Sequence, residues 1–241
     1  MTSTQRTLVY STAPFCALEC SRPSFILRYP NSTATDIIAH GLPEQSLINW
    51  CKQFCQTDHM FVDIGAHAGM YALSLAPYCK SVHAFECQRH TYYQLCGGIA
   101  MNAYWNVYPH RVALGDREEK QITMYVVSAD GGGTTLTKPD TFMEEDSVQM
   151  RTLDSYELDN ISFLKLDVEG AEEIVLHGAT ETLKRSNYPP FIFESWTDEK
   201  YAVQRESLHN FIVHTLGYSL ININGYPHMM LAVRDIFGNA I

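Results

Sequence analysis

The chain has 241 residues, of which 46% are hydrophobic, 12% aromatic and 18% charged, a composition that allows a globular domain with a substantial core and excludes a disordered chain. Its 17 lysines and arginines against 27 aspartates and glutamates give a formal charge of −10. This charge disfavours a nucleic-acid partner, because the average surface potential repels phosphate groups.

The sequence also limits where the protein is expected to work. The N-terminus lacks the continuous apolar core of a signal peptide, and no run of 18 apolar residues occurs. The seven cysteines, at positions 16, 20, 51, 55, 79, 87 and 96, form an odd set without a CxxC pair or nearby histidines at zinc-site spacing. We therefore predict a cytoplasmic protein with reduced thiols and without membrane insertion.

The first third of the chain is predicted to lead into the main domain. Residues 1–35 are rich in Ser, Thr and Pro and predict an N-terminal extension with one short strand over residues 24–29. After residue 36 the apolar residues are interrupted by Gly41 and Pro43, which favours two short helices before residue 55.

From residue 60 onward, apolar runs alternate with stretches of helical spacing. Buried strands of this kind, separated by helices, indicate a parallel sheet covered on both faces. The last two runs are joined by the short turn at residues 224–227, which is too short for a helical crossover and makes them antiparallel neighbours. The predicted fold is α/β, with a Rossmann-like doubly wound, seven-stranded, mostly parallel sheet and a C-terminal antiparallel hairpin. The predicted strands are residues 60–65, 81–86, 106–114, 161–167, 190–195, 218–224 and 228–235, and the main helices are 69–78, 89–103, 171–183 and 198–216.

Residues 121–153 depart from this alternation. Two strand-like stretches flank the glycines Gly131, Gly132 and Gly133, and we interpret the segment as an insertion at the edge of the sheet. The glycines, together with Thr134 and Thr135, form either a mobile cover over a bound acceptor or simply a flexible surface loop. The sequence leaves both alternatives open.

The segment FVDIGAHAGMYALSL, residues 61–75, predicts a strand, a tight turn and a helix. Gly65 allows the turn, and the helix that opens at Gly69 presents free N–H groups and a partial positive charge to a carboxylate. The methionine part of S-adenosylmethionine (AdoMet) supplies such a carboxylate. Asp63, at the end of the strand, is expected to meet the amino group of this cofactor or to order water around it.

Glu86 ends the next strand, 86 − 63 = 23 residues after Asp63. A carboxylate at this place can accept hydrogen bonds from both ribose hydroxyls, in dinucleotide sites as well as in AdoMet sites. The glycines discriminate between the two, because the middle glycine of G-x-G-x-x-G is missing and Asp63 would repel a pyrophosphate. We therefore favour AdoMet and keep an NAD(P)-dependent oxidoreductase or epimerase as the alternative.

The motifs resemble those of the FkbM family of AdoMet-dependent, class I methyltransferases over about residues 36–235. FVDIGAHAGMY is similar to the first motif, and FECQRHTYYQLCGGIAMN to the second, with Cys87 in place of the more usual proline. TLDSYELDNISFLKLDVEGAEEIVLHGA is similar to the most specific stretch. The resemblance implies that residues 36–241 form a class I methyltransferase domain that methylates a hydroxyl group of a sugar, glycan or natural product. The cofactor site predicted with it consists of Asp63, Gly65, Ala66, His67, Gly69, Glu86, Cys87, Ala113 and Asp167.

Methylation of an alcohol requires an aligned acceptor oxygen and a group that removes its proton. Asp167 lies at the carboxyl edge of the predicted sheet and is the first candidate for catalysis. Lys165 shares its face and either forms an ion pair with it or contacts the substrate. Glu169 is a further catalytic candidate, although it and Glu172 can equally stabilise the start of a helix. Glu194 ends the next strand and can act as a base, orient a hydroxyl or bind a divalent metal, whose presence the sequence leaves open.

The predicted acceptor is a carbohydrate or another small molecule with a hydroxyl group. An RNA ribose 2′-hydroxyl is chemically similar, and only the acidic charge and the missing basic patch speak against it. A catalytically silent interaction module is disfavoured, because the acids and the glycine of the proposed site are all present. The sequence leaves open which hydroxyl is modified and whether the protein forms a homodimer.

Overall fold

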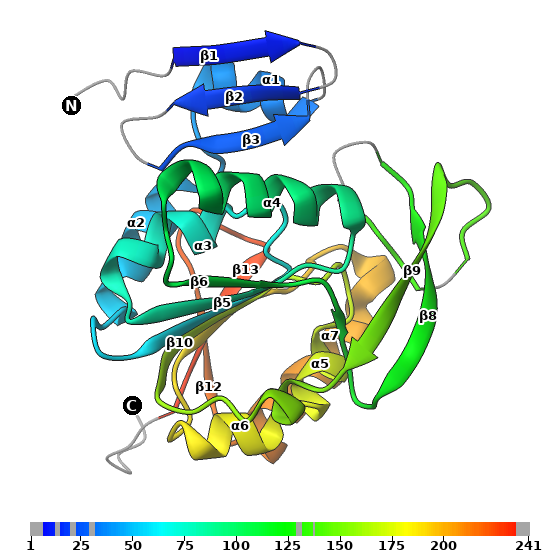
Figure 1. Ribbon diagram of the computed structural model, residues 1–241. Coiled ribbons are helices and arrows are strands. Elements are labelled where there is room, and N and C mark those ends of the chain that lie inside the picture. Colours follow the sequence, from blue (N-terminus) through cyan, green and yellow to red (C-terminus); the bar gives the residue numbers. More distant parts are fainter. Residues whose placement is uncertain are drawn as a thin grey trace.

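A seven-stranded sheet lies at the centre of the computed structural model, which describes residues 7–12, 15–19, 23–28, 32–128, 132–136 and 138–234 (Figure 1). The strand order is β12-β13-β11-β10-β4-β5-β6. The strands from β11 to β6 are parallel, and β13 is antiparallel to both of its neighbours. This arrangement confirms the predicted fold class and the C-terminal hairpin. The strands are β4 (Met60–Ile64), β5 (Ser81–Phe85), β6 (Val107–His110), β10 (Ile161–Leu166), β11 (Phe191–Glu194), β12 (Ser219–Asn222) and β13 (Met229–Val233).

Helices cover both faces of this sheet. Side chains alternate along each strand, so Phe61 and Phe163 lie in the core on one face while Val62 and Leu164 lie in the core on the other. Because both faces are covered there, the middle strands of the sheet are mostly apolar, with Asp63 of β4 and Lys165 of β10 as buried charged residues. The first face is covered by α1 (Ser32–His40), α2 (Gln45–Cys51), η1 (Lys52–Phe54), α3 (Met70–Leu75), η2 (Ala76–Tyr78) and α4 (Arg89–Asn102), and the second by α5 (Glu172–His177), α6 (Thr180–Arg185), α7 (Ala202–Asn210) and the π-helical turn η5 (Phe211–Thr215). Two 3-10 turns, η3 (Leu153–Tyr156) and η4 (Glu199–Tyr201), lie in connections.

One predicted helix is divided in two. The amphipathic stretch at residues 171–183 forms α5 and α6, with a break at Gly178. A Cβ atom on Gly178 would lie 1.9 Å from the carbonyl oxygen of Gly115, so the two chain segments touch there. The carboxylate of Asp154 then accepts a hydrogen bond of 2.6 Å from the N–H of Thr182 in the first turn of α6. Contacts with distant segments, which the helical pattern does not contain, therefore end one helix and start the next.

The N-terminal segment contains more structure than the single strand predicted from its sequence. β1 (Thr7–Thr12), β2 (Phe15–Glu19) and β3 (Phe25–Arg28) form an antiparallel sheet that lies above α4 in Figure 1. In β3, Phe25 and Leu27 are buried in the core. Asn102 of α4 exchanges two hydrogen bonds with the backbone of Ser24, at 2.8 and 2.7 Å. The division of the chain at residue 35 stays a prediction, and Cys20 and Gly131 lie outside the described residues.

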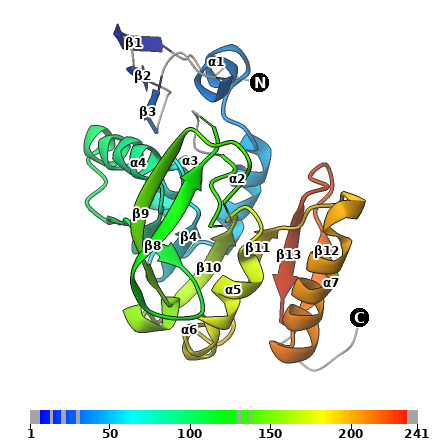
Figure 2. The same cartoon turned by 90° about the vertical axis from the view of Figure 1, so that its right-hand side faces the viewer.

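The predicted insertion forms a second, smaller sheet with the strand order β7-β9-β8. β8 (Glu119–Val126) and β9 (Glu144–Arg151) stand beside the central sheet in Figure 1 and in front of it in Figure 2. The single strand predicted over residues 106–114 is divided between β6 and β7 (Ala113–Leu114), which belong to different sheets. The insertion therefore has its own hydrogen-bonded framework and does not extend the edge of the central sheet.

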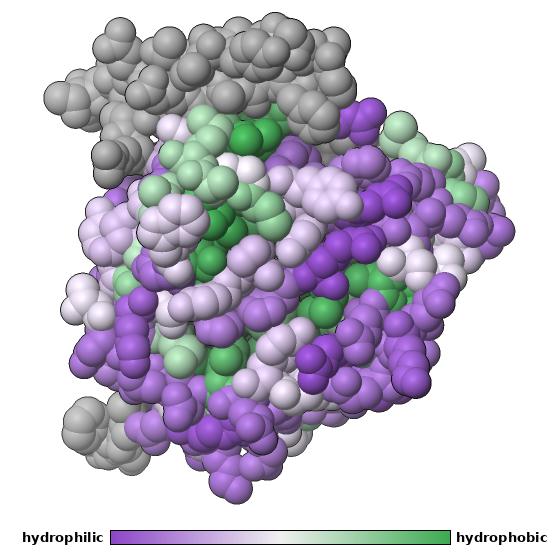
Figure 3. All heavy atoms as spheres, viewed as in Figure 1, coloured by the Kyte–Doolittle hydropathy of each residue, from purple (hydrophilic) through white to green (hydrophobic). Residues whose placement is uncertain are grey.

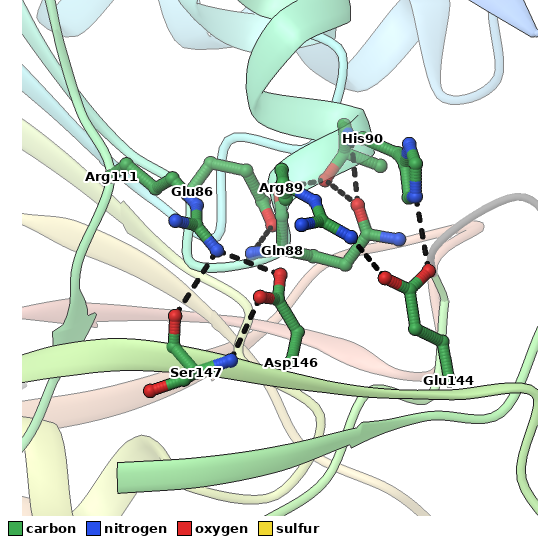
Figure 4. A network of polar contacts seen from close by, with 9 residues as sticks. Glu86, Gln88, Arg89, His90, Arg111, Glu144, Asp146 and Ser147 are labelled. Atoms are coloured by element: carbon green, nitrogen blue, oxygen red, sulfur yellow. Dashed lines mark hydrogen bonds and ion pairs between the residues drawn. The ribbon is translucent and has the colours of Figure 1, made fainter. Parts of the chain in front are cut away.

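Ion pairs hold the small sheet against the start of α4 (Figure 4). Glu144 of β9 pairs with Arg89 and lies 3.1 Å from the Nε2 atom of His90. Asp146 of the same strand accepts a 2.7 Å hydrogen bond from Arg111. Figure 3 shows hydrophilic residues gathered along this junction. Among the described helices, none combines the length and the apolar character needed to cross a bilayer.

Candidate functional site

A cavity of about 410 Å³ lies at the carboxyl ends of β4, β5 and β10, the edge where open α/β sheets bind their ligands. Most of the predicted site residues lie in its wall, whereas Asp63, Gly69 and Glu194 do not. Described residues of the connection between β8 and β9 complete the wall. The predicted residues that line the cavity are Gly65, Ala66, His67, Glu86, Cys87, Ala113, Lys165, Asp167 and Glu169.

The turn after β4 brings three strand ends together. The N–H groups of Gly65 and Ala66 both donate to the carbonyl oxygen of Phe85, at 3.0 and 2.9 Å. Gly65 has a φ of +77°, and a Cβ atom on it would lie 1.7 Å from the carbonyl oxygen of Asp167. Only glycine fits this position, because a side chain would collide with the backbone at the end of β10. The turn thereby leaves the floor of the cavity open.

Glu86 is held with its carboxylate at the cavity wall. One oxygen, Oε2, accepts a 2.8 Å hydrogen bond from the N–H of His67. The other, Oε1, accepts one of 2.8 Å from the N–H of Gln88, which Figure 4 shows. Each carboxylate oxygen can accept a second hydrogen bond, so the group keeps acceptor capacity for a ligand. Burial, and then the charge of Glu86, raise the pKa of Cys87 well above that of an ordinary thiol. Cys87 is therefore a neutral wall residue.

Lys165 lies between two carboxylates beneath the cavity. Its Nζ atom is 2.8 Å from the carbonyl oxygen of Gly65, 3.1 Å from Asp167 Oδ2 and 3.8 Å from Asp63 Oδ1. Burial alone would lower the pKa of Lys165, but Asp167 and Asp63 hold it above its usual value. The ammonium group is thus charged and engaged. The sequence left two alternatives for Lys165, an ion pair with Asp167 or contact with the substrate, and the structure contains the ion pair.

Asp63 supports the turn from behind. Its side chain is fully buried, and Oδ2 accepts a 2.9 Å hydrogen bond from the N–H of Ala72 in the first turn of α3. Burial raises the pKa of Asp63 to about 6, although Lys165 opposes the rise. Gly69 precedes α3 and faces the side chains of Leu73 and Leu95. The predicted contacts of Asp63 and Gly69 with a cofactor stay predictions, and in this structure both residues lie outside the cavity wall.

Glu44 and Tyr71 are cavity residues that the sequence reasoning did not identify. Glu44 directly precedes α2 and has a φ of +53°. Its Oε2 atom accepts a 2.6 Å hydrogen bond from the hydroxyl of Tyr71, whose pKa is raised by burial and by Glu44. Glu44 therefore adds a fourth carboxylate to the cavity wall, beside those of Glu86, Asp167 and Glu169. The sequence carries no signal for this pair, because the two residues are 27 positions apart, before α2 and in α3, and meet only in the folded chain.

The two glutamates after β10 have different roles. Glu169, in the cavity wall, accepts a 2.9 Å hydrogen bond from the N–H of Gly133 and so joins the β8–β9 connection to the rim. Glu172 is buried, and its Oε1 atom accepts hydrogen bonds from Val168 at 3.0 Å and Gly170 at 3.3 Å. Burial raises the pKa of Glu172. Glu172 thus orders the loop before α5, and whether the β8–β9 connection moves as a cover stays a prediction.

Glu194 lies at the end of β11, outside the cavity wall. Burial, and then the charge of Asp167, raise its pKa to about 8. Its Oε2 atom is buried and has no hydrogen-bond partner among the described residues. Within the same residues, no three histidine, cysteine or acidic side chains are grouped to bind a metal ion. The predicted roles of Glu194 stay predictions.

Comparison with known proteins points to one family. Residues 63–226 match the family model described as the methyltransferase FkbM domain. A search of curated protein sequences returned no match. Among solved structures, methyltransferase FkbM from Methylobacillus flagellatus KT is similar with a TM-score of 0.53 and 18% identity, over 73% of this chain. The tRNA (uracil-54, C5)-methyltransferase of Pyrococcus abyssi, solved in complex with S-adenosyl-L-homocysteine, has a TM-score of 0.51 and 10% identity over 92% of this chain. The aligned region spans 44% of each of these two proteins, and at such identities they bear on the fold alone.

Proposed function

The chain belongs to the FkbM methyltransferase family, and from this premise we propose that it transfers a methyl group from AdoMet to a hydroxyl group of a sugar or glycan. One observation carries the proposal. The cavity wall combines two features. One is the turn at Gly65, where the backbone leaves no room for a side chain, and the other is the carboxylate of Glu86, held by two backbone N–H groups. This is the combination that a nucleoside with an amino-acid tail requires.

The apolar residues and the charges of the cavity wall support AdoMet as the ligand. Glu86 would accept hydrogen bonds from the ribose, and apolar residues around it, among them Phe85, Val112 and Leu114, would enclose the adenine. Near the turn, Glu44 would face the methionine end. The acidic residues of the wall outnumber its single lysine, Lys165, which suits a ligand with a sulfonium and an ammonium group and opposes a pyrophosphate. This charge balance favours AdoMet over NAD(P).

When bound, AdoMet supplies an electrophilic methyl group. The chain must then hold an acceptor oxygen in line and remove its proton. Asp167 is the carboxylate in the cavity wall at the end of β10, and Lys165 restrains its Oδ2 atom at 3.1 Å. We assign Asp167 the role of accepting the proton of the hydroxyl, with Lys165 as the residue that positions it. Glu169 and Glu194 are the further acids proposed to act at this end.

The acceptor class follows from chemistry and not from the fold. A hydroxyl acceptor needs a base nearby, for which Asp167 offers a carboxylate. An acidic protein with a net charge of −10 favours a neutral acceptor over a polyanion. A natural-product hydroxyl meets the same requirements. RNA is therefore one arm of the test and not the proposed substrate.

Binding and turnover test the proposal separately. Calorimetry is expected to detect AdoMet and S-adenosylhomocysteine but not NAD(P). Incubation with methyl-labelled AdoMet is expected to label members of a panel of neutral oligosaccharides, but not RNA oligonucleotides. Asp167→Asn, which keeps the size of the side chain, should reduce turnover about 100-fold or more. Absence of AdoMet binding would remove the proposed function, and methylation of RNA alone would replace its acceptor.

A further inference from the structure

A second cavity, of about 340 Å³, lies between α2 and the β12–β13 hairpin. Its wall includes Ser46 and Trp50 from α2 and Asn222, Asn224 and Tyr226 from the hairpin, and we call it the hairpin groove. The two sides are joined by a 3.1 Å hydrogen bond from the N–H of Leu47 to the hydroxyl of Tyr226. Figure 2 shows α2 next to the hairpin. The groove is therefore a built feature that two parts of the chain create together.

The groove residues carry the chemistry of sugar recognition. Trp50 is 37% exposed, and its ring packs edge-on against Phe54 with centroids 5.0 Å apart, so the indole is held in place. Asn222 and Asn224 are exposed, and their amide groups form no hydrogen bond with the rest of the described chain. An aromatic ring offers an apolar platform, and side-chain amides offer both donors and acceptors to hydroxyl groups.

The groove has no charge. None of its wall residues is a lysine, arginine, aspartate or glutamate, in contrast to the acidic cavity described above. A nucleic acid would need cations for its phosphates, and a cationic or anionic small molecule would need a counter-charge. Stacking on Trp50 would suit a base as well as a sugar, but the absence of cations in the groove wall disfavours RNA. The lining fits a neutral polyhydroxyl ligand.

The walls of the groove and of the proposed active site contain residues that are close in the sequence. Glu44 lines the first cavity, and Ser46, two residues later, lines the groove. β12 runs parallel to β10 and ends at the same edge of the sheet, three strands away. Three strand spacings correspond to about 14 Å, which is longer than one sugar ring. A chain of sugars with one hydroxyl at Asp167 would therefore span the distance to the end of β12, where Asn222 lines the groove.

We propose that the hairpin groove binds a second part of the acceptor, so that the substrate is a neutral oligosaccharide and not a monosaccharide. The apolar face of one sugar ring stacks on Trp50, and its hydroxyls bond to Asn222 and Asn224. This inference rests on the proposed function for the position of the reactive hydroxyl, but the groove itself binds sugar with or without AdoMet.

The test compares groove variants with a matched tryptophan control. Trp50→Ala and Asn222→Ala are expected to raise the KM for neutral trisaccharides about tenfold, with AdoMet affinity unchanged. Trp105→Ala removes a tryptophan that is 78% exposed and lies beyond α4, outside both cavities, and should leave the KM unchanged. Asn222 is exposed, so its variant separates loss of binding from loss of folding, which thermal unfolding of each variant checks.

Direct binding keeps the groove and the proposed function distinguishable. Saturation-transfer NMR with neutral trisaccharides, in the absence of AdoMet, is expected to show contact with the wild type and a loss with Trp50→Ala. If AdoMet binds and sugars are methylated with the same KM in wild type and groove variants, the groove proposal is overturned and the proposed function stands. Absence of any trisaccharide signal, or RNA binding that depends on Trp50, overturns the groove proposal as well. If trisaccharides bind at Trp50 but AdoMet does not bind, only the proposed function fails.

Discussion

Replacing Lys165 with methionine is expected to lower the free energy of unfolding by about 3–5 kcal/mol. The Lys165 ammonium lies 3.1 Å from Asp167 and 3.8 Å from Asp63. With an effective dielectric constant of about 20, these distances correspond to roughly 5 and 4 kcal/mol of attraction, most of which the desolvation of the three charges offsets. Methionine keeps the length of the side chain but leaves two neighbouring carboxylates without their cation. The net loss is therefore that of breaking a buried ion pair.

The loss is expected to depend on pH through Asp63. Burial raises the pKa of Asp63 to about 6 against the opposing effect of Lys165, so removing Lys165 should raise it further. A carboxyl group with a raised pKa in the folded state favours folding while it is protonated, and this contribution is lost as the pH rises through the folded-state pKa. The stability deficit of Lys165→Met should therefore be large at about pH 8 and smaller at about pH 5.

Urea unfolding of the wild type and the variants at both pH values measures this effect. The double variant Lys165→Met/Asp63→Asn removes one of the two uncompensated charges and should recover part of the lost stability. Lys184→Met serves as the control, because Lys184 is exposed and lies 4.0 Å from Glu181, and it should change stability by less than about 0.5 kcal/mol. A loss below about 1 kcal/mol that is the same at both pH values would refute the role of Lys165 as the buried counter-charge.

Three further predictions concern the acids of the site. Glu86→Gln should raise the AdoMet dissociation constant about 30-fold, because charge-assisted hydrogen bonds to the ribose become neutral; an unchanged constant in calorimetry would undo the ribose assignment. Glu44→Gln should raise the same constant about tenfold while the amide oxygen still accepts from Tyr71, and equal affinities would place the methionine end elsewhere. Glu194 has a pKa raised to about 8, so the wild type should lose more stability between about pH 5 and pH 8 than Glu194→Gln, which keeps only the contribution of other groups such as Asp63. Thermal unfolding of both proteins across this pH range tests the prediction. The change in unfolding free energy should differ between them by on the order of 1 kcal/mol, because Glu194 is partly exposed, and parallel pH profiles would contradict the prediction.

The central sheet could be predicted because its pattern is local. Strands buried on both faces appear as mostly apolar runs, and the helices between them repeat with a period near 3.6 residues. Gly65 and Glu86 could also be predicted as site residues, because they follow the ends of two neighbouring parallel strands and therefore meet at one edge of the sheet. The small sheet was harder to predict. Its strands β8 and β9 carry exposed polar residues, and the division between β6 and β7 depends on pairing with β9, far along the chain.

The candidate site shows the same division between local and distant causes. Asp63 has the place in the sequence that a ligand-binding acid would have, but its burial depends on the helix that packs over it and on Lys165, 102 residues later (165 − 63 = 102). The break at Gly178 likewise depends on the close approach of Gly115.

The sequence by itself determined the order of strands and helices, the glycine turn and the two acids at the strand ends, because each of these follows from side chains within one or two elements. Only the tertiary structure decided that Lys165 is enclosed by two carboxylates, that Glu44 faces the cavity and that α2 and the last hairpin form a groove. These features arise where segments distant in the chain come within a few ångströms of each other. Burial, charge and hydrogen bonding there are set jointly by the partners, and no spacing within a single segment records them.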